Sequence, residues 1–339
     1  MRAVFRVDAS WAIGSGHLSR CLTLARSLVR TGFTVAVATR NPTDHTKKAV
    51  VREGLELLVV EGEELIGARR AAEGATLVVV DGYGFGADLH AALREPGRVV
   101  AVIDDTASAP VDGDVVLNGN FFAESLRYDG VATTLLGPTY ALVRDEFREA
   151  REAREARSGD GTRRVLVSMG GADPACATEA FIDATSELAP SELRIVVGGA
   201  NPRVEAIRAA AARIAGHRVE VLVDVARMSE PMLWCDVAVV AAGSTCLELA
   251  CLGVPAVVVA VADNQDPVAG EVARRGLMRS VGRFGASSGH DLTREVESLL
   301  ADGSVRRRMV SDQRATIDGT GAERAAAALD DIVSSRKAP

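Results

Sequence analysis

The 339-residue sequence is poor in aromatic residues and carries a net negative charge. Phe, Trp and Tyr make up only 4% of the residues, and the formal charge is −7. Such a chain has no basic face to neutralise a phosphate backbone and few rings on which bases stack. We therefore expect no nucleic acid among its partners.

Long apolar runs and metal-binding spacings are missing as well. Asp8, His17 and Arg20 interrupt the first 30 residues, and no later apolar run approaches the ~18 residues of a membrane-spanning helix. We expect a cytoplasmic protein with no membrane partner. The sequence has no HExxH, no EF-hand loop and no cluster of His and Cys, so we expect neither a metal nor a cofactor.

The cysteines form no CxxC pair. They lie mostly in apolar patterns, which is typical of small buried side chains rather than of a redox or metal site. The five are Cys21, Cys176, Cys235, Cys246 and Cys251.

Hydrophobic residues make up 47% of the chain, enough for two cores, and the length also favours two domains. Apolar, β-branched runs alternate with segments of helical period, which predicts parallel sheets with crossover helices. The strands expected in the first half are 2–8, 34–39, 55–60, 77–81, 99–104 and 114–118. Those expected in the second half are 163–171, 193–199, 218–225, 237–243, 255–263 and 277–282.

A charged segment, YALVRDEFREAREAREARSGDGTRR (140–164), interrupts this alternation. We expect an N-terminal domain at 1–145, a linker helix and turn at 146–162 whose charges face solvent, and a C-terminal domain at 163–339. The last helix is free to pack back on the first domain. The fold class is α/β, with two Rossmann-like doubly wound domains that face a cleft, in a monomer or a weak homodimer.

The stretch IGSGHLSR (13–20) places Gly14 and Gly16 between the first strand and a helix that begins near Leu18. Free backbone N–H groups at such a turn favour an anion. The third glycine of GxGxxG is missing, as is an acidic residue after the second strand and any GxxxxGK[ST], so neither a dinucleotide nor a P-loop is favoured. At the positive end of the helix, His17 is either a neutral general base or simply a capping or packing residue.

Two turns in the second half repeat this design. SMGGADPACAT (168–178) contains Gly170 and Gly171, and AAGSTCLELACLGVP (241–255) contains Gly243 followed by hydroxyl and acidic side chains. Two anion-ready helix starts fit a diphosphate, and a carboxylate one turn into the helix can accept both hydroxyls of a ribose. The same residue types are also ordinary helix caps, so both interpretations stay open. The side chains concerned are Ser244, Thr245 and Glu248.

Several longer motifs occur together and in order. They are FRVDASWAIGSGHLSRCLTLA, VVVDGY, VIDD, YALVRDEF, VLVSMGGADP, AGSTCLELACLGVP, ADNQ and IDGTGAERAAAAL. Over nearly the whole chain they resemble the PseG family, the UDP-2,4-diacetamido-2,4,6-trideoxy-β-L-altropyranose hydrolases of pseudaminic acid biosynthesis. That family has the glycosyltransferase-B fold and is similar to the enzyme that adds N-acetylglucosamine in lipid II synthesis.

The resemblance implies metal-free hydrolysis of a UDP-linked amino or deoxy sugar, with water as the acceptor. It implies catalytic roles for His17, Tyr83 and Asn264. It also implies substrate-binding roles for Asp8, Ser244, Thr245 and Glu248. We further expect Gly14, Gly16, Gly170, Gly171, Gly243 and Gln265 to bind substrate, the glycines because of the turns in which they lie. Gly82, before Tyr83, stands where the family commonly has a bulkier residue. Transfer of the sugar to a small acceptor and non-catalytic binding of a nucleotide sugar remain the competing interpretations.

Overall fold

The computed structural model describes residues 1–8, 16–153, 163–171, 173–199 and 201–336. The chain divides into two compact units. The first contains Met1–Arg144 and Gly319–Pro339, and the second contains Asp145–Asp318. Each unit is built on its own parallel sheet.

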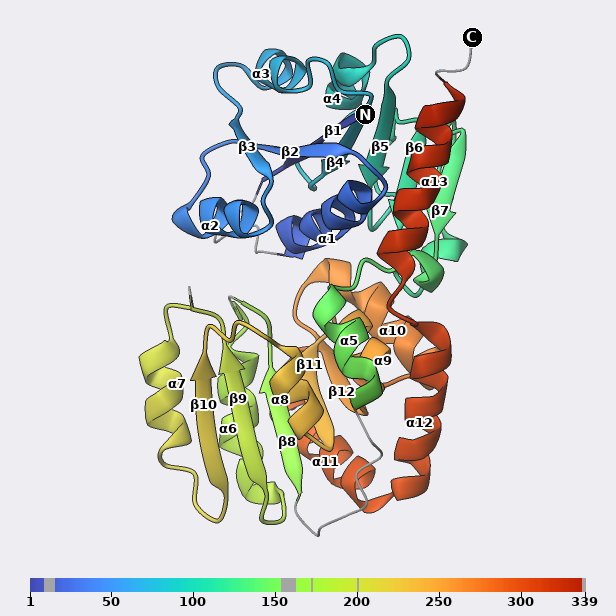
Figure 1. The fold of residues 1–339 in the computed structure, drawn as a ribbon. Coiled ribbons are helices and arrows are strands. Elements are labelled where there is room, and N and C mark those ends of the chain that lie inside the picture. The colour runs from blue at the N-terminus through green and yellow to red at the C-terminus, as the bar shows by residue number, and fades with distance from the viewer. Residues whose placement is uncertain (9–15, 154–162, 172, 200, 337–339) are drawn as a thin grey trace. The chain divides into compact units, whose positions relative to one another are not determined.

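The sheet of the first unit has seven strands in the order β3-β2-β1-β4-β5-β6-β7 (Figure 1). Its central strands are buried along nearly their whole length, as expected for continuous apolar runs in a sheet covered on both faces. The short edge strand β7 is an addition to the predicted set, because its polar start gives no strand pattern. The strands are β1 (Arg2–Val7), β2 (Thr34–Thr39), β3 (Glu56–Val59), β4 (Leu77–Asp81), β5 (Val99–Ile103), β6 (Val115–Asn118) and β7 (Thr133–Leu136).

Helices cover both faces of this first sheet. On one face, α1 (Gly16–Arg30), α2 (Asp44–Arg52) and α13 (Gly321–Ser335) contribute to one apolar core. On the other face, α3 (Glu64–Ala71) and α4 (Ala87–Leu93) contribute to a second core. The last helix of the chain, α13, therefore completes the unit that contains the N-terminus (Figure 1).

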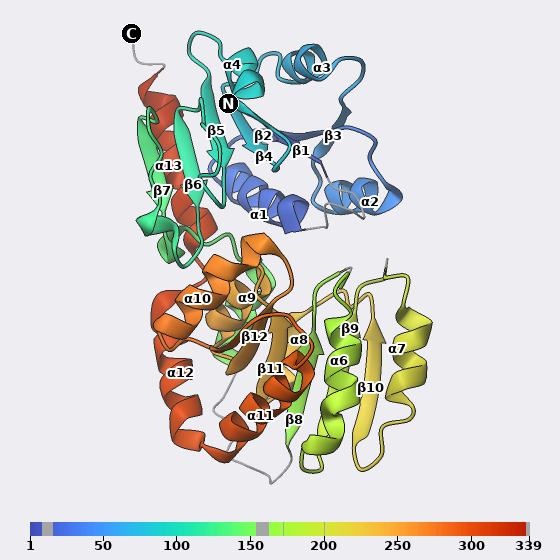
Figure 2. The same ribbon diagram turned by 180° about the vertical axis from the view of Figure 1, so that it is seen from behind.

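The second unit has six parallel strands in the order β10-β9-β8-β11-β12-β13. Helices α6, α7 and α11 cover the face that is seen from the front in Figure 2. The strands are β8 (Arg164–Ser168), β9 (Glu192–Val197), β10 (Arg218–Val223), β11 (Val237–Ala241), β12 (Ala256–Ala260) and β13 (Arg279–Arg283). The helices are α5 (Asp145–Ala153), α6 (Ala177–Ala184), α7 (Val204–Ala211), α8 (Ser229–Trp234), α9 (Thr245–Leu252), α10 (Asp266–Arg274), α11 (Ser288–Ala301) and α12 (Gly303–Thr316).

In both sheets the first strand lies inside, and the chain winds outward first on one side and then on the other. This confirms the predicted class of two Rossmann-like doubly wound domains. The predicted strands differ from the observed ones by at most three residues at either end. Both units therefore carry the loops that follow their strands at one edge of a parallel sheet, where open α/β sheets bind ligands.

Helix α5 lies in the segment expected to be a solvated linker. Phe147 is fully buried, and the guanidinium of Arg151 donates to the carbonyl oxygens of Cys251 and Ile317 at 2.9 and 2.6 Å. These carbonyls lie at the ends of α9 and α12, where helices leave acceptors unsatisfied. Packing of α5 in the second unit thus follows from helix-end chemistry that its charge pattern does not reveal.

Candidate functional site

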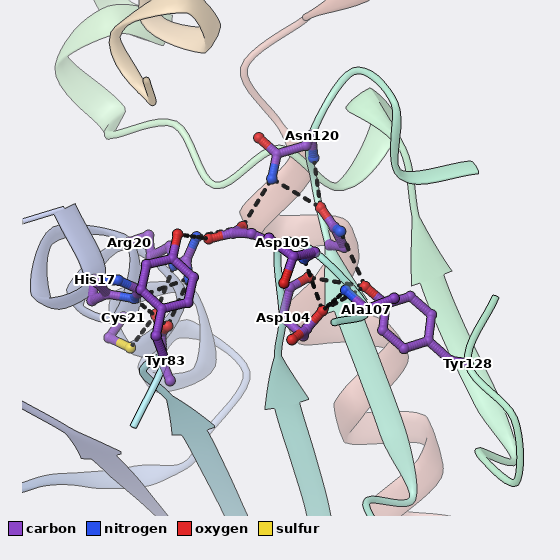
Figure 3. A network of polar contacts seen from close by, with 12 residues as sticks. His17, Arg20, Cys21, Tyr83, Asp104, Asp105, Ala107, Asn120 and Tyr128 are labelled. Atoms are coloured by element: carbon purple, nitrogen blue, oxygen red, sulfur yellow. Dashed lines mark hydrogen bonds and ion pairs between the residues drawn. The ribbon is translucent and has the colours of Figure 1, made fainter. Parts of the chain in front are cut away.

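A network of polar side chains lies at the carboxyl edge of the first sheet (Figure 3). Asp81 is the last residue of β4, Asp105 follows β5, and Asn120 follows β6. The start of α1 adds His17 and Arg20. Because β1, β4, β5 and β6 are neighbours, residues far apart in the sequence meet at this edge.

The imidazole of His17 is held by a buried carboxylate. Its Nδ1 lies 2.6 Å from Oδ1 of Asp81, and the side chain of Asp81 has no exposed surface. Burial acts to raise the pKa of Asp81, but the charge of Arg20, with the hydrogen bonds from Arg20 and His17, lowers it to about 2. An ionised carboxylate only accepts hydrogen bonds, so Nδ1 of His17 carries a hydrogen, and in the neutral form of the ring Nε2 is then the atom that accepts a proton.

Arg20 completes the environment of this carboxylate. Its Nε donates to Oδ2 of Asp81 and its Nη2 donates to Oδ1, each at 2.7 Å. Nη2 also lies 3.1 Å from Nδ1 of His17, a contact between two N–H groups rather than a hydrogen bond. The thiol of Cys21 donates to Oδ2 at 3.3 Å, so the oxygens of Asp81 are fully used.

Tyr83 stands over His17 with its ring edge-on. The two ring centroids are 4.8 Å apart and the planes meet at 87°. The hydroxyl of Tyr83 donates to Oδ2 of Asp105 at 3.0 Å, while 59% of the residue is exposed. The two side chains predicted to be catalytic in this unit therefore lie together, one buried and one open to solvent.

Asp105 connects Tyr83 to the rest of the network. It accepts from Nη1 of Arg20 at 2.7 and 2.8 Å and from Nδ2 of Asn120 at 2.8 Å. The preceding acid, Asp104, accepts from the hydroxyl of Tyr128 at 2.9 Å. The carboxylate of Asp105 is therefore saturated with donors from α1, from the loop after β4 and from the loop after β6.

Local packing explains why a glycine precedes Tyr83 at position 82. Its φ is +157°, and a β-carbon there would lie 3.0 Å from the ring of Phe85. That ring in turn lies 4.5 Å from the guanidinium carbon of Arg6. A bulkier residue at this position would displace the ring of Phe85. The glycine found here, in place of the bulkier residue expected from the family, is therefore explained by contact with that ring.

The structure does not bring Asp8 into this network. Its carboxylate binds Arg6 at 2.6 and 2.8 Å and accepts from the hydroxyl of Thr39 and the amide of Arg40. Burial acts to raise the pKa of Asp8, and these hydrogen bonds lower it. Contact of Asp8 with a sugar stays a prediction.

The turn before α1 contains two glycines that are predicted to bind substrate, Gly14 and Gly16. Gly14 lies outside the described residues. Gly16 is the first residue of α1 and is exposed, and no atom of the described residues lies within 4 Å of the place of a β-carbon on it.

In the second unit, four of the residues predicted to bind substrate lie at the carboxyl ends of three neighbouring strands. Gly170 and Gly171 follow β8, Gly243 follows β11, and Gln265 follows β12. The amide nitrogen of Gln265 lies 3.9 Å from the place of a β-carbon on Gly243. The turns after β11 and β12 are therefore in contact.

The starts of the two helices differ in a way that the sequence pattern does not show. At α6, the carboxylate of Asp173 accepts from the amides of Ala177 and Thr178 at 3.0 and 2.9 Å. That helix start already holds an anion of its own. At α9, the side chain of the N-cap residue Ser244 makes no capping hydrogen bond, so this helix start is better suited to a phosphate than that of α6.

Glu248 lies in the first turn of α9 and is partly exposed, while Ser244 is exposed. Asn264 lies on the short 3₁₀ helix Asp263–Gln265 and is exposed. It belongs to the second unit, whereas His17 and Tyr83 belong to the first. Its catalytic role stays a prediction.

Among the members of the network that sequence reasoning missed are Arg20, Asp81 and Asp105. Each has a visible signal. Asp81 ends a wholly apolar run, Asp105 is the second of two acids that follow another, and Arg20 follows His17 by one helical turn. An acid at the end of a buried parallel strand is the pattern that points to this edge of the sheet.

Among the described residues, no group of three His, Cys, Asp or Glu side chains is arranged to hold a metal ion. None of the helices in the described ranges combines the length and hydropathy needed to cross a membrane.

Searches of known proteins find distant relatives. No protein-family model matches the chain. Over 337 residues the chain is 23% identical to the spore coat polysaccharide biosynthesis protein SpsG of Bacillus subtilis (strain 168), covering 96% of each protein. Over 214 residues it is 26% identical to the UDP-2,4-diacetamido-2,4,6-trideoxy-beta-L-altropyranose hydrolase of Campylobacter jejuni subsp. jejuni serotype O:2, covering 61% of this chain and 73% of that one.

Solved structures resemble the chain over its full length. MurG of Acinetobacter baumannii superimposes with a TM-score of 0.71 at 17% identity, covering 98% of this chain and 100% of that one. The calicheamicin glycosyltransferase CalG4 superimposes with a TM-score of 0.67 at 17% identity, covering 100% of both chains. The chain thus has the two-domain, Rossmann-like fold of these proteins, in agreement with the predicted glycosyltransferase-B fold.

Proposed function

We propose that this protein hydrolyses a UDP-linked amino or deoxy sugar, of the UDP-2,4-diacetamido-2,4,6-trideoxyhexose type, to free sugar and UDP without a metal. The observation that carries the proposal is the hydrogen bond between Nδ1 of His17 and the buried carboxylate of Asp81, which fixes the tautomer of the ring. Asp81 holds the hydrogen on Nδ1, which leaves Nε2 to accept a proton beside the exposed ring of Tyr83. The hydrolase from Campylobacter jejuni, similar over 61% of this chain, supports the substrate class.

In the proposed reaction, Nε2 of His17 takes a proton from a water molecule. The water oxygen forms a bond to the anomeric carbon while the bond from that carbon to the phosphate oxygen breaks, and the electron pair leaves with UDP. Asp81 stabilises the imidazolium that forms, as a buried carboxylate does in other acid–base pairs. Attack opposite the leaving group inverts the anomeric centre.

The leaving diphosphate is assigned to the second unit. The start of α9, where the side chain of Ser244 makes no capping hydrogen bond, offers the amides and hydroxyls of Ser244 and Thr245 to the developing charge. Glu248, one turn into the helix, is assigned to the ribose. Gly170, Gly171, Gly243 and Gln265 line the same edge of the sheet, and Asn264 is assigned to the reacting sugar as a further proposal.

The test is turnover of a panel of UDP-linked diacetamido and amino sugars in ¹⁸O-labelled water containing EDTA. We expect label at the anomeric hydroxyl and inverted configuration by NMR. His17→Gln should reduce turnover by roughly 10²- to 10⁴-fold, whereas His45→Gln, on exposed α2, should leave it unchanged. Label in the phosphate, or normal turnover in His17→Gln, would contradict the proposal.

Sugar transfer is the second candidate, because the fold is shared with the glycosyltransferase CalG4. Nε2 of His17 would deprotonate an acceptor hydroxyl in the same way. A transferase requires its acceptor, so release of UDP without any added alcohol or amine at the full rate distinguishes hydrolysis from transfer. Tight binding without turnover of any panel member would instead indicate a non-catalytic nucleotide-sugar-binding protein.

A further inference from the structure

One guanidinium joins the two halves of the network in Figure 3. Arg20 makes two hydrogen bonds to Asp81 and two to Asp105, all between 2.7 and 2.8 Å. Asp81 holds His17, and Asp105 holds Tyr83. The side chain of Arg20 is 20% exposed, so these contacts are shielded from most of the solvent.

The charge of Arg20 bears directly on His17. Asp81 alone, buried 2.6 Å from Nδ1, would favour the imidazolium, because an opposite charge at that distance stabilises the charged ring. Arg20 compensates that carboxylate and brings its own positive charge to 3.1 Å from Nδ1. Among the described residues, the pair is also faced by Cys21, whose thiol binds Asp81, by Tyr83, whose ring covers His17, and by Asp105, which binds Arg20.

The planar shape of the Arg20 guanidinium helps to fix the position of Tyr83 through Asp105. A planar guanidinium presents its donors in a rigid fork, and both sides of the fork are engaged here. Asp105 is held from one side by Arg20 and from another by Asn120, which leaves Oδ2 directed at the hydroxyl of Tyr83. The distance between the two rings therefore depends on the same side chain that balances the charge.

We propose that Arg20 is a positioning residue that offsets the charge of Asp81 beside His17 and, through Asp105, holds Tyr83 over that ring. The assignment rests on the proposed function for its effect on turnover. Its effect on His17 itself is a property of the ligand-free protein and is measured without substrate.

The first experiment follows the ring protons of His17 by NMR between pH 4 and 9 in the ligand-free protein, with His17→Gln to assign them. In Arg20→Met, the pH at which His17 takes up its proton should rise by about one to two units, because the nearby cation is gone and Asp81 is uncovered. In Arg20→Lys, which keeps the charge, the shift should be much smaller. Equal titration in wild type and Arg20→Met would overturn the charge role, whether or not the protein hydrolyses a UDP-sugar.

Turnover provides the second readout. The acidic limb of the kcat/KM profile should move upward in Arg20→Met by the same amount as the NMR titration. Arg20→Lys should keep the limb and lower kcat, because a lysine lacks the fork. A uniform loss of activity in both variants with unmoved limbs would indicate a merely structural role and would refute the proposal.

Asp105→Asn tests the contact with Tyr83 even if the Arg20 variants fail to fold. Asp105 is 14% exposed at its side chain and lies at the edge of the network. If Asp105 acts through Tyr83, Tyr83→Phe should lower kcat/KM strongly in the wild type and little in the Asp105→Asn background. Independent, multiplicative losses would contradict the link.

Discussion

The carboxylate of Asp81 lies fully buried beneath His17, 2.6 Å from Nδ1 of the ring. An asparagine in its place keeps the shape but removes the charge that stabilises an imidazolium, and it can turn its amide N–H toward the ring. We expect Asp81→Asn to reduce turnover of the UDP-sugar by roughly 10²- to 10⁴-fold, with UDP affinity unchanged. Steady-state kinetics and calorimetric titration with UDP measure the two quantities.

The matched control is Asp44→Asn, because the side chain of Asp44 is 89% exposed on α2. It should leave both quantities unchanged. If Asp81→Asn lost UDP affinity in proportion to turnover, the variant would be misfolded rather than catalytically impaired, and far-ultraviolet circular dichroism would show it.

The lowered pKa of Asp81 should also make the stability of the folded protein depend on pH in the acidic range. Its pKa is lowered to about 2 in the folded protein, against about 3.9 in an unfolded chain. The stabilisation is therefore complete above about pH 4 and is lost as the pH falls toward 2. Chemical unfolding at pH 7, 4 and 3 should show a steeper loss of stability in the wild type than in Asp81→Asn. Parallel curves would contradict the buried ion pair.

His90 should make stability depend on pH in the neutral range. The residue is 2% exposed, and within the described part of the chain neither ring nitrogen has a hydrogen-bond partner. Burial lowers its pKa, with Asp112 and Asp104 acting in the opposite direction. Because the unfolded chain binds the proton near pH 6.5, stability should fall as the pH drops below that value.

His90→Leu tests this dependence, since it keeps a similar volume without a titrating ring. Its stability should vary less between pH 7.5 and 5.5 than that of the wild type. His45→Gln, an exposed histidine on α2, should retain the wild-type dependence. An unchanged slope in His90→Leu would show that His90 is not the group responsible.

The architecture follows closely from the sequence because parallel strands buried on both faces leave an unmistakable pattern. Runs such as LVVVD and VVAVI have no polar alternation and are bounded by turn residues. Strand β7 escapes this reasoning, because Thr133–Leu136 is short, begins with two threonines and lies at an edge. The burial of Arg6 within β1 could not be predicted in this way either. A charged side chain is buried there because it pairs with Asp8 and Glu64, which lie outside that strand.

The site is partly readable from the sequence and partly not. A histidine at the start of a helix and a tyrosine after a strand are visible as candidates. Their meeting depends on strand order, which places the ends of β1, β4 and β5 side by side. Which carboxylate takes which donor depends on side chains 61 and 85 residues beyond Arg20, and no local pattern contains that information. The same holds for Asp173, which occupies the start of α6.

Helix α13 should be essential for the stability of the first unit. Leu329 is fully buried in the core that α13 shares with α1. Leu329→Ala should destabilise the protein by about 2 to 5 kcal/mol, and hydrogen exchange should rise in α1. Asp331→Ala, exposed on the same helix, should change stability by less than about 0.5 kcal/mol. Normal protection of α1 in Leu329→Ala would contradict this coupling.

Glu248 provides the sharpest test of the nucleotide site. If its carboxylate accepts both hydroxyls of the ribose, Glu248→Gln should weaken UDP binding by about 10- to 100-fold, the range expected for hydrogen bonds to a charged group. The wild type should discriminate against 2′,3′-dideoxy-UDP by a similar factor, whereas Glu248→Gln should bind the two nucleotides alike. Glu205→Gln, whose side chain is 83% exposed on α7, is the control and should behave as the wild type. Should Glu248→Gln keep full discrimination, Glu248 would be an ordinary first-turn acid of α9, and the ribose would be bound by another group.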